Sequence, residues 1–462
     1  MAHVSKLSSL HRREFLKRAS AASVAATAAP WALQLAAIGD AAAATGGGDY
    51  KALVCVFLHG GNDYGNTVIP YDDVSHQAYA AIRPTLAIGR DALAATALAP
   101  TIALPDGRQM ALAPGLSAVK PVFDAGRLAV MLNIGTLLAP TTLAQFKAGS
   151  ATLPPKLFSH NDQASLWQSS NVEGARTGWG GRMADLMLSS NGRSGLTCIN
   201  VSGNAIFQAG ENAFQYQMGV GGKQAIAGIG GGLFGSTACA SLMKSLITED
   251  RSHPMESELN RVTARSIDLQ STLSGALAGG ASMATAFAAD SLAQQLRMVA
   301  RMIAARSTLG MSRQVFFVSM GGFDLHDNLP SRHPALMQQV GGAMASFDAA
   351  LQELGVADKV TAFTASDFGR TLSSNGDGTD HGWGSHHLVM GGAVRGGRFY
   401  GSAPSVSVNG PDDVGQGRLL PTTSVDQLAS TLALWMGVPS SELRTVLPNI
   451  GNFAGPDLGF MG

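Results

Sequence analysis

The stretch ALVCVFL, at residues 52–58, decides the expected fold. It is an uninterrupted apolar run of strand length, rich in β-branched and aromatic residues, and it ends at the turn sequence HGGND, residues 59–63. Strands that are buried on both faces, as in a parallel sheet, have this composition. We therefore predict a central parallel strand that is followed by a glycine turn.

Four more segments have the same character, and amphipathic helices lie between them. The further strands are predicted at residues 128–133, 314–320, 360–364 and 388–391. Apolar residues at helical spacing predict helices over 292–303 and 336–354, and Ser424 with Gln427 forms a capping-box pattern that opens a last helix. Strands that alternate with such helices indicate an α/β fold, a mostly parallel sheet with helices on both faces.

Composition excludes several classes of protein. The chain has 462 residues with 32 basic and 32 acidic side chains, and 45% of its residues are hydrophobic. This is too apolar for a disordered chain, and the neutral balance lacks the basic footprint of a nucleic-acid-binding protein. There are three cysteines, Cys55, Cys198 and Cys239, without a C-x-x-C pair. We expect small buried side chains, with pairing of Cys198 and Cys239 as the alternative.

Residues 1–44 have the pattern of an export signal. The segment HRREFLK, residues 11–17, resembles the twin-arginine signal, and an Ala-rich stretch leads to small residues at 42–44. The alternative is an amphipathic N-terminal helix. The signal predicts the twin-arginine translocase as a partner and a periplasmic or secreted mature protein without a membrane span. Residues 45–462 then form one α/β domain, with a Gly-rich insertion at 202–235 as a hairpin or lid.

Aspartate and histidine gather where the predicted strands end. His59 and Asp63 follow the first strand, Asp324 and His326 the third, and Asp367 the fourth. Further candidates are in the segments 159–162 (SHND) and 380–387 (DHGWGSHH). The carboxyl ends of the strands form the ligand crevice of an open α/β sheet, and oxygen with imidazole nitrogen suits divalent metals. The alternative is a set of residues that cap turns and helices.

Long motifs in the chain resemble the DUF1501 family of bacterial exported proteins. Residues 366–401 read SDFGRTLSSNGDGTDHGWGSHHLVMGGAVRGGRFYG and resemble the family signature. Residues 56–70, 321–328 and 420–453 resemble its opening strand, its G-G-[WF]-D-x-H-x-N motif and its closing helix. The family is grouped with the alkaline phosphatase and sulfatase superfamily. The resemblance therefore implies a three-layer α/β/α sandwich around a mostly parallel mixed sheet, alkaline-phosphatase-like.

The resemblance also implies a site. Active members of that superfamily hold divalent metals with Asp and His at strand ends, and a nucleophile lies at a helix N-terminus. Transferred to this sequence, Ser159 beside His160 is the candidate nucleophile, and Arg370 is a candidate clamp for an anion. The implied metal ligands are Asp63, Asp324, His326, Asp367, Asp380 and His381, with His386 as an outlying option.

These expectations favour an exported metal-dependent hydrolase of phosphate or sulfate esters. Zinc, manganese and calcium are the candidate ions, and the substrate is a small molecule or a polymer. The first alternative is a non-catalytic exported protein that binds a ligand or partner with the same fold. The second is a structural metal site without turnover.

Overall fold

The computed structural model describes residues 50–222, 226–279 and 282–462. The export signal lies outside the described residues, so the twin-arginine signal and its cleavage near Ala44 stay predictions. Within the described residues no helix is both long and apolar enough to cross a membrane.

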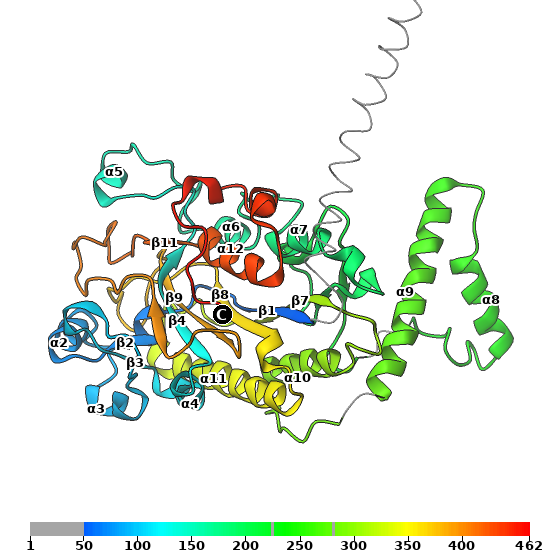
Figure 1. Ribbon diagram of the computed structural model, residues 1–462, viewed down its shortest axis with the longest axis horizontal. Coiled ribbons are helices and arrows are strands. Elements are labelled where there is room, and N and C mark those ends of the chain that lie inside the picture. The colour runs from blue at the N-terminus through cyan, green and yellow to red at the C-terminus, as the bar shows by residue number, and fades with distance from the viewer. Residues whose placement is uncertain (1–49, 223–225, 280–281) are drawn as a thin grey trace, which may run out of the picture.

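Nine strands of the described chain form one sheet in the order β10-β4-β9-β8-β1-β7-β5-β6, with β11 paired to β4 (Figure 1). Only β9 runs antiparallel to its neighbours β4 and β8. The strands of this sheet are β1 (Lys51–Leu58), β4 (Leu128–Gly135), β5 (Cys198–Asn200), β6 (Gln215–Gln217), β7 (Arg313–Met320), β8 (Val360–Ser366), β9 (Ser385–Gly391), β10 (Arg398–Tyr400) and β11 (Thr423–Ser424). A separate antiparallel pair consists of β2 (Val68–Pro70) and β3 (Met110–Leu112). All five predicted strands are confirmed.

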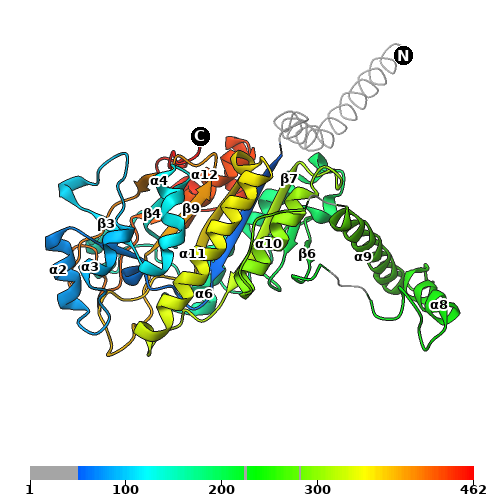
Figure 2. The ribbon, with the colours of Figure 1, turned by 90° about the horizontal axis from the view of Figure 1, so that it is seen from below.

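Helices cover both faces of this sheet, as Figures 1 and 2 show. One layer contains α4 (Lys120–Asp124), α10 (Ser291–Ala304) and α11 (Leu329–Glu353), and the other contains α6 (His160–Ser169), α7 (Trp179–Asp185), α12 (Val425–Met436) and α13 (Leu443–Val446). The remaining helices are α2 (Asp73–Ile82), α3 (Arg90–Leu93), α5 (Leu143–Lys147), α8 (Thr237–Thr248) and α9 (Pro254–Ala278). The three-layer α/β/α fold around a mostly parallel mixed sheet is therefore confirmed.

The central strand β1 divides its side chains between two hydrophobic cores. Ala52, Val54, Val56 and Leu58 belong to the core under α10 and α11, while Leu53, Cys55 and Phe57 belong to the core under α7 and α12. This alternation follows from the two-residue period of a strand. It explains why the whole run had to be apolar.

The predicted helix signals hold in the structure. Ser424 and Gln427 form a complete capping box at the start of α12. Gly355 has a φ of +65° directly after the C-cap of α11, in the left-handed conformation that ends a helix. The predicted helix over 336–354 begins earlier than expected, at Leu329, and contains Pro334.

The predicted Gly-rich insertion adds an edge to the sheet. β6, inside it, pairs in parallel with β5, so this pairing is not a hairpin. Beyond it the chain forms α8 and α9, which project from the body (Figures 1 and 2). The three cysteines are free; Cys55 and Cys198 are buried and Cys239 is exposed, so the alternative pairing of Cys198 with Cys239 is absent.

Three buried histidines make stability depend on pH. Burial lowers the pKa of His333 to about 4 and of His386 and His387 to about 3. In the unfolded chain a histidine has a pKa near 6.5, so the unfolded state takes up protons first as the pH falls. The stabilisation is therefore complete above about pH 6.5 and is lost as the pH falls toward the folded pKa values.

We expect the free energy of unfolding to fall by up to roughly 1.4 kcal/mol per pH unit for each of these histidines below pH 6.5. Urea unfolding between about pH 7 and pH 4 measures the slope. His333→Gln should reduce the slope of the free energy of unfolding against pH by the contribution of one proton. His253→Gln, at an exposed position, is the control. Equal slopes for wild type and His333→Gln would contradict the prediction.

Candidate metal centre

Three neighbouring strands end at one level, and each delivers side chains to the same edge. Leu58 of β1 is paired with Met320 of β7 and with Ser366 of β8, the last residues of those strands. The segments that follow contain His59, Asp324 and Asp367. The register of the sheet thus brings His59 together with residues that are some 260 to 310 positions further along the chain.

A glycine allows these segments to meet. Gly60 has a φ of +115°, and a Cβ atom there would lie 2.4 Å from the amide nitrogen of Asp324. Its own amide donates to Asp367 Oδ2 at 3.0 Å, and its carbonyl accepts from Arg370. Any side chain at position 60 would force the β1 turn away from the Asp324 segment.

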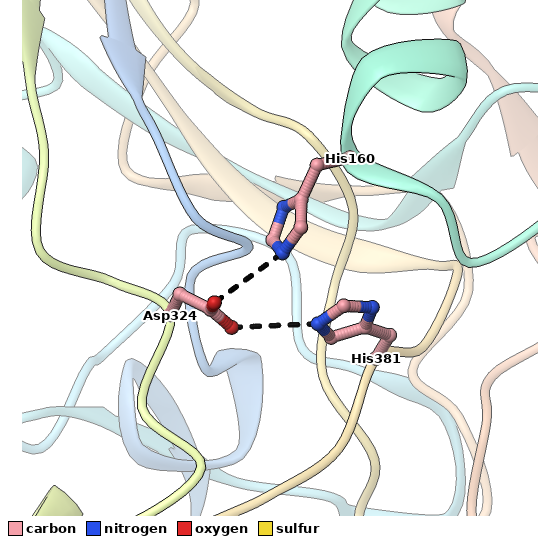
Figure 3. Close-up of side chains that lie close together, drawn as sticks. All are labelled: His160, Asp324 and His381. Carbon is pink, nitrogen blue, oxygen red and sulfur yellow. Dashed lines mark ion pairs between the residues drawn. The ribbon is translucent and has the colours of Figure 1, made fainter.

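His381 presents a free nitrogen to Asp324. Its Nδ1 lies 2.8 Å from the carbonyl oxygen of Phe158. Because a carbonyl only accepts hydrogen bonds, Nδ1 carries the proton and Nε2 keeps its lone pair in the neutral ring. Burial lowers the pKa of His381, although the bond to Phe158 opposes this, so the neutral ring is favoured. Nε2 lies 3.4 Å from Asp324 Oδ1 (Figure 3).

His160, the first residue of α6, reaches Asp324 from the other side. Its Nδ1 lies 2.7 Å from Asp367 Oδ2, and its Nε2 lies 3.5 Å from Asp324 Oδ2 (Figure 3). The hydrogen bond that His160 donates to Asp367 raises the pKa of His160, while burial opposes the shift. A carboxylate that holds one ring nitrogen and aims the other at a common point is typical of histidines that bind metal.

His326 repeats this pattern with Asp380. Its Nδ1 lies 3.3 Å from Asp380 Oδ1, and its Nε2 lies 3.1 Å from Asp324 Oδ1. Burial opposes ionisation of Asp380, but hydrogen bonds from Asn375 and His326 hold its pKa below the ordinary value. An ionised carboxylate accepts, so His326 donates through Nδ1 and directs its Nε2 inward.

The group fits a divalent cation. The Nε2 atoms of His326 and His381 are only 2.9 Å apart, and two lone pairs at that distance repel unless a proton or a cation lies close to both. Ligand atoms of His160, Asp324 and His381 all lie within 4.8 Å of one another. Tetrahedral zinc with bonds of 2.0–2.1 Å separates its ligand atoms by about 3.4 Å, close to the distances found here.

Two buried polar atoms at this site lack a hydrogen-bond partner among the described residues. They are His160 Nε2 and Asp367 Oδ1. A buried acceptor without a partner is costly in free energy, so each requires an explanation. A cation bound between the imidazoles and the carboxylates supplies one.

Arg370 is placed differently from the prediction of a substrate clamp. Its side chain is fully buried, and it donates to Gly60 O, to Asp324 Oδ1 at 2.8 Å and to the carbonyl of Thr379. Burial opposes ionisation of Asp324, but the bond and charge of Arg370 outweigh it and hold the pKa of Asp324 below its ordinary value. Arg370 thus orients an ionised Asp324.

The structure does not bring Asp63 into the group. Its carboxylate accepts two hydrogen bonds from Arg83, at 3.1 and 2.6 Å, and both side chains are almost fully buried. Asp63 lies in a short 3-10 turn that begins well past the end of β1, so the chain has already turned away from the sheet edge. His386, the outlying option, is buried, and its Nδ1 accepts from the amide of Asn133.

Ser159 precedes α6 as the N-cap residue, but its hydroxyl does not bond to the helix amides. It donates to Asp162 Oδ2 at 2.7 Å. The neighbouring His160 is the residue of this segment that enters the site. The predicted role of Ser159 as nucleophile therefore has no support in the geometry.

A cleft of about 660 Å³ opens beside this group of histidines and aspartates. It is lined by His59, His160, Asp324 and Asp367 at one end. Its other walls come from the start of α6, from the loop around Glu173 and from Asn204, Ala205 and Ile206 of the predicted insertion. A cleft at the carboxyl edge of the strands is where an α/β sheet usually binds its ligand.

Sequence reasoning missed two residues that hold the histidines in place. Phe368 is buried, and its ring packs 4.8 Å from the rings of both His160 and His381. The carbonyl of Phe158 fixes the His381 tautomer. The position of Phe368 next to Asp367 is visible in the sequence, but a backbone carbonyl leaves no sequence signal.

The fold and the site together define an α/β/α protein with a candidate metal centre at the carboxyl edge of its central strands. The family model described as "Protein of unknown function (DUF1501)" matches residues 50–447, and the chain belongs to this family. The resemblance found in the motifs is thereby confirmed. No curated protein matches the sequence.

Several solved structures are similar to the chain at low sequence identity. The PsFucS1 sulfatase from Pseudoalteromonas sp. is 11% identical, with a TM-score of 0.33 over 88% of this chain and 72% of that one. BT1596, a 2-O GAG sulfatase, is 9% identical, with a TM-score of 0.27 over 87% and 75%. A variant of the alkaline phosphatase PafA is 10% identical, with a TM-score of 0.26 over 70% and 64%. Likenesses at these values define no activity for this chain.

Proposed function

We propose that this protein is an exported metal-dependent hydrolase of phosphate or sulfate esters. One observation supports this above all: three imidazole Nε2 atoms converge on the Asp324 carboxylate at the end of an open cleft. Each of these rings is held through Nδ1 by an oxygen acceptor. Such an arrangement is more organised than a set of turn caps requires.

The donor set favours zinc or manganese over calcium among the three predicted ions. It offers three imidazole nitrogens and the Asp324 carboxylate, and Asp367 Oδ2 lies 2.7 Å from His160 Nδ1. Imidazole suits zinc and similar transition metals, whereas calcium binds six to eight oxygen ligands. Four such donors match the usual coordination number of zinc.

A divalent ion bound here would polarise an ester oxygen and lower the pKa of a water molecule. The chain itself performs the remaining tasks. Asp367 and Asp380 fix the tautomers of their histidines, and Arg370 keeps Asp324 ionised. His59, about half exposed at the cleft, is placed to hydrogen-bond to a bound ester.

The charge of the side chains that line the cleft indicates which esters it would bind best. Among the described residues that line it, none is lysine or arginine, and Glu173, Asp324 and Asp367 are acidic. A phosphate monoester has nearly two negative charges at neutral pH. A sulfate ester or a phosphodiester has one, and one charge is easier to balance with a single metal ion and neutral histidines. Singly charged esters are therefore the preferred substrates.

Hydrolysis assays test this proposal directly. The mature chain, purified without chelators, is assayed on para-nitrophenyl sulfate, para-nitrophenyl phosphate and bis(para-nitrophenyl) phosphate. We expect a chelator to abolish hydrolysis and zinc or manganese to restore it. His160→Ala should lower kcat/KM by about 100-fold or more, since even the loss of a residue that only orients a ligand costs 10–100-fold.

The matched control is the adjacent Ser159→Ala. Because the Ser159 hydroxyl bonds to Asp162 and not to the histidines, we expect its kcat/KM to stay within about three-fold of wild type. A large loss with Ser159→Ala would restore the nucleophile hypothesis. No metal-dependent hydrolysis of any of the three esters would overturn the proposed function.

Export is the part of the proposal that depends on residues 1–44. Its support is the pair Arg12-Arg13 with Phe15-Leu16-Lys17 and the weakly apolar stretch that follows. We expect that replacing both arginines by lysine keeps the precursor in the cytoplasm, measured by cell fractionation. An unchanged yield of processed protein outside the cytoplasm would contradict a twin-arginine route.

A further inference from the structure

The helices α8 and α9 form an arm that extends from the body, as both views show (Figures 1 and 2). Thirteen large hydrophobic side chains are exposed among the described residues, and ten of them lie between positions 214 and 262. Six are on the arm itself: Leu242, Met243, Leu246, Met255, Leu259 and Val262. An exposed apolar surface of this kind marks an interaction site.

One face of α9 has a heptad pattern. Apolar or small residues recur at alternating spacings of four and three: Met255, Leu259, Val262, Ser266, Leu269, Leu273 and Ala276. Leu273 and Ala276 are buried in the main core, and Leu269 packs against it. The same stripe therefore anchors the arm at its C-terminal end and continues into solvent at its N-terminal end. A period of 3.5 residues is the pattern of helices that pair with other helices.

The pairing of α8 with α9 leaves this stripe uncovered. Ser257 and Asn260 of α9 are buried, and they hydrogen-bond to Asp250 and to the carbonyls of Leu246 and Glu249. Polar side chains of α9 thus contribute to the contact within the arm. Meanwhile Met255 and Leu259 are 75% and 64% exposed. In an isolated helical hairpin the apolar side chains would face the other helix and the polar ones would face solvent, whereas here Ser257 and Asn260 are buried and the apolar stripe is exposed.

We propose that the exposed half of the α9 stripe pairs in antiparallel orientation with α9 of a second copy of this chain. The charged side chains beside the stripe favour a second α9 helix as the binding partner. When Leu259 lies opposite the partner's Val262, Met255 lies opposite the partner's Ser266. Glu258 and Arg265 form an exposed ion pair within their own helix, at 3.1 Å. In that register Glu258 also faces the partner's Arg265, and two-fold symmetry repeats the pair, so the four charges form one network. Flanking charges of this kind set partner choice and orientation in paired helices.

The arm also lacks the features of a surface that binds anionic lipid. Between residues 237 and 278 it has four basic side chains, Lys244, Arg251, Arg261 and Arg265, and five acidic ones, Glu249, Asp250, Glu256, Glu258 and Asp268. A helix that lies on a membrane is rich in lysine and arginine on its polar face. The arm is instead nearly neutral, and α9 has both acidic and basic side chains, so its charges can complement those of a second copy of the same helix.

Sedimentation of the purified mature chain over a range of concentrations tests the pairing. We expect a concentration-dependent dimer for wild type. Leu259→Asp should sediment as a monomer, because two carboxylates would enter the apolar contact. Ile102→Asp is the matched control: Ile102 is 60% exposed on the body, and its replacement should leave the dimer unchanged.

Charge reversal tests the register. Glu258→Arg alone and Arg265→Glu alone each place like charges opposite each other, and we expect each to weaken the dimer by about ten-fold. An equimolar mixture of the two single variants should restore it, because each chain then meets opposite charges on its partner while the pair within its own helix stays broken. Neither residue lies near the metal-binding group, so ester hydrolysis should not change.

A monomeric wild type, or a dimer that Leu259→Asp does not dissociate, would overturn the inference. Binding of the wild type to lipid vesicles as a monomer would assign the stripe to a membrane instead. Failure of the mixture of single variants to recover the dimer would reject the antiparallel register. None of these results depends on whether the protein hydrolyses esters.

Discussion

Asp324→Asn should lose the metal that the wild-type protein retains. Asp324 is the acceptor on which His160, His326 and His381 converge, and its carboxylate places a negative charge at that point. Asparagine has nearly the same shape but no charge, so it removes the attraction for a cation with little change in packing. We expect metal content after purification to fall at least about ten-fold.

Elemental analysis of protein purified without chelators measures the content directly. A second measurement is the stability gained when zinc is added: at a hundred-fold excess over its Kd, a ligand raises the free energy of unfolding by about 2.7 kcal/mol. Wild type should show this gain, and Asp324→Asn should not. Glu173→Gln is the control, since Glu173 lines the same cleft but pairs with Lys156. Equal metal content in Asp324→Asn and wild type would falsify the assignment.

Arg83→Met should destabilise the fold by about 3–5 kcal/mol, because it leaves the buried charge of Asp63 without a partner. The Arg83 and Asp63 side chains are 0% and 1% exposed and share two hydrogen bonds. Burial opposes ionisation of Arg83, but the charge of Asp63 outweighs it and raises the pKa of Arg83. A methionine fills much of the space but cannot compensate the carboxylate.

Urea unfolding of a short series of variants separates charge from packing. Arg83→Met/Asp63→Asn should be less destabilised than Arg83→Met alone, because the double variant has no uncompensated charge. Arg90→Met breaks an exposed ion pair with Asp73 and should cost less than about 1 kcal/mol. An Arg83→Met protein within about 1 kcal/mol of wild type would contradict the account of Asp63 as a buried structural partner.

The central strands and several helix ends could be predicted from the sequence. The run at residues 52–58 is apolar at every position because β1 faces a hydrophobic core on both sides. The capping box at Ser424 and the glycine after α11 are local signals that need no tertiary context. Local chemistry of this kind is fully encoded in neighbouring residues, so the five strands and the α/β class were predictable.

The set of residues at the site was only partly predictable. Asp324, His326, Asp367, Asp380 and His381 were expected at the sheet edge, and the structure brings them together with His160. Asp63 was expected there too, but it turns toward Arg83. The candidate nucleophile Ser159 and the neighbouring His160 were both expected at the site, yet only His160 points into it. A spacing rule cannot distinguish neighbours whose side chains point in different directions.

The sequence by itself determined which segments become strands, which ends are capped, and which residue types are available for a cation. Only the tertiary structure decided which of them meet. That outcome depends on the strand order β8-β1-β7, on the common level at which Leu58, Met320 and Ser366 end, and on single contacts such as the Phe158 carbonyl on His381. The heptad spacing of the α9 stripe can likewise be read from the sequence. Which half of the stripe is exposed cannot, because exposure depends on where the body ends. Local pattern is set by neighbours in the chain, whereas convergence and exposure are set by packing between distant segments.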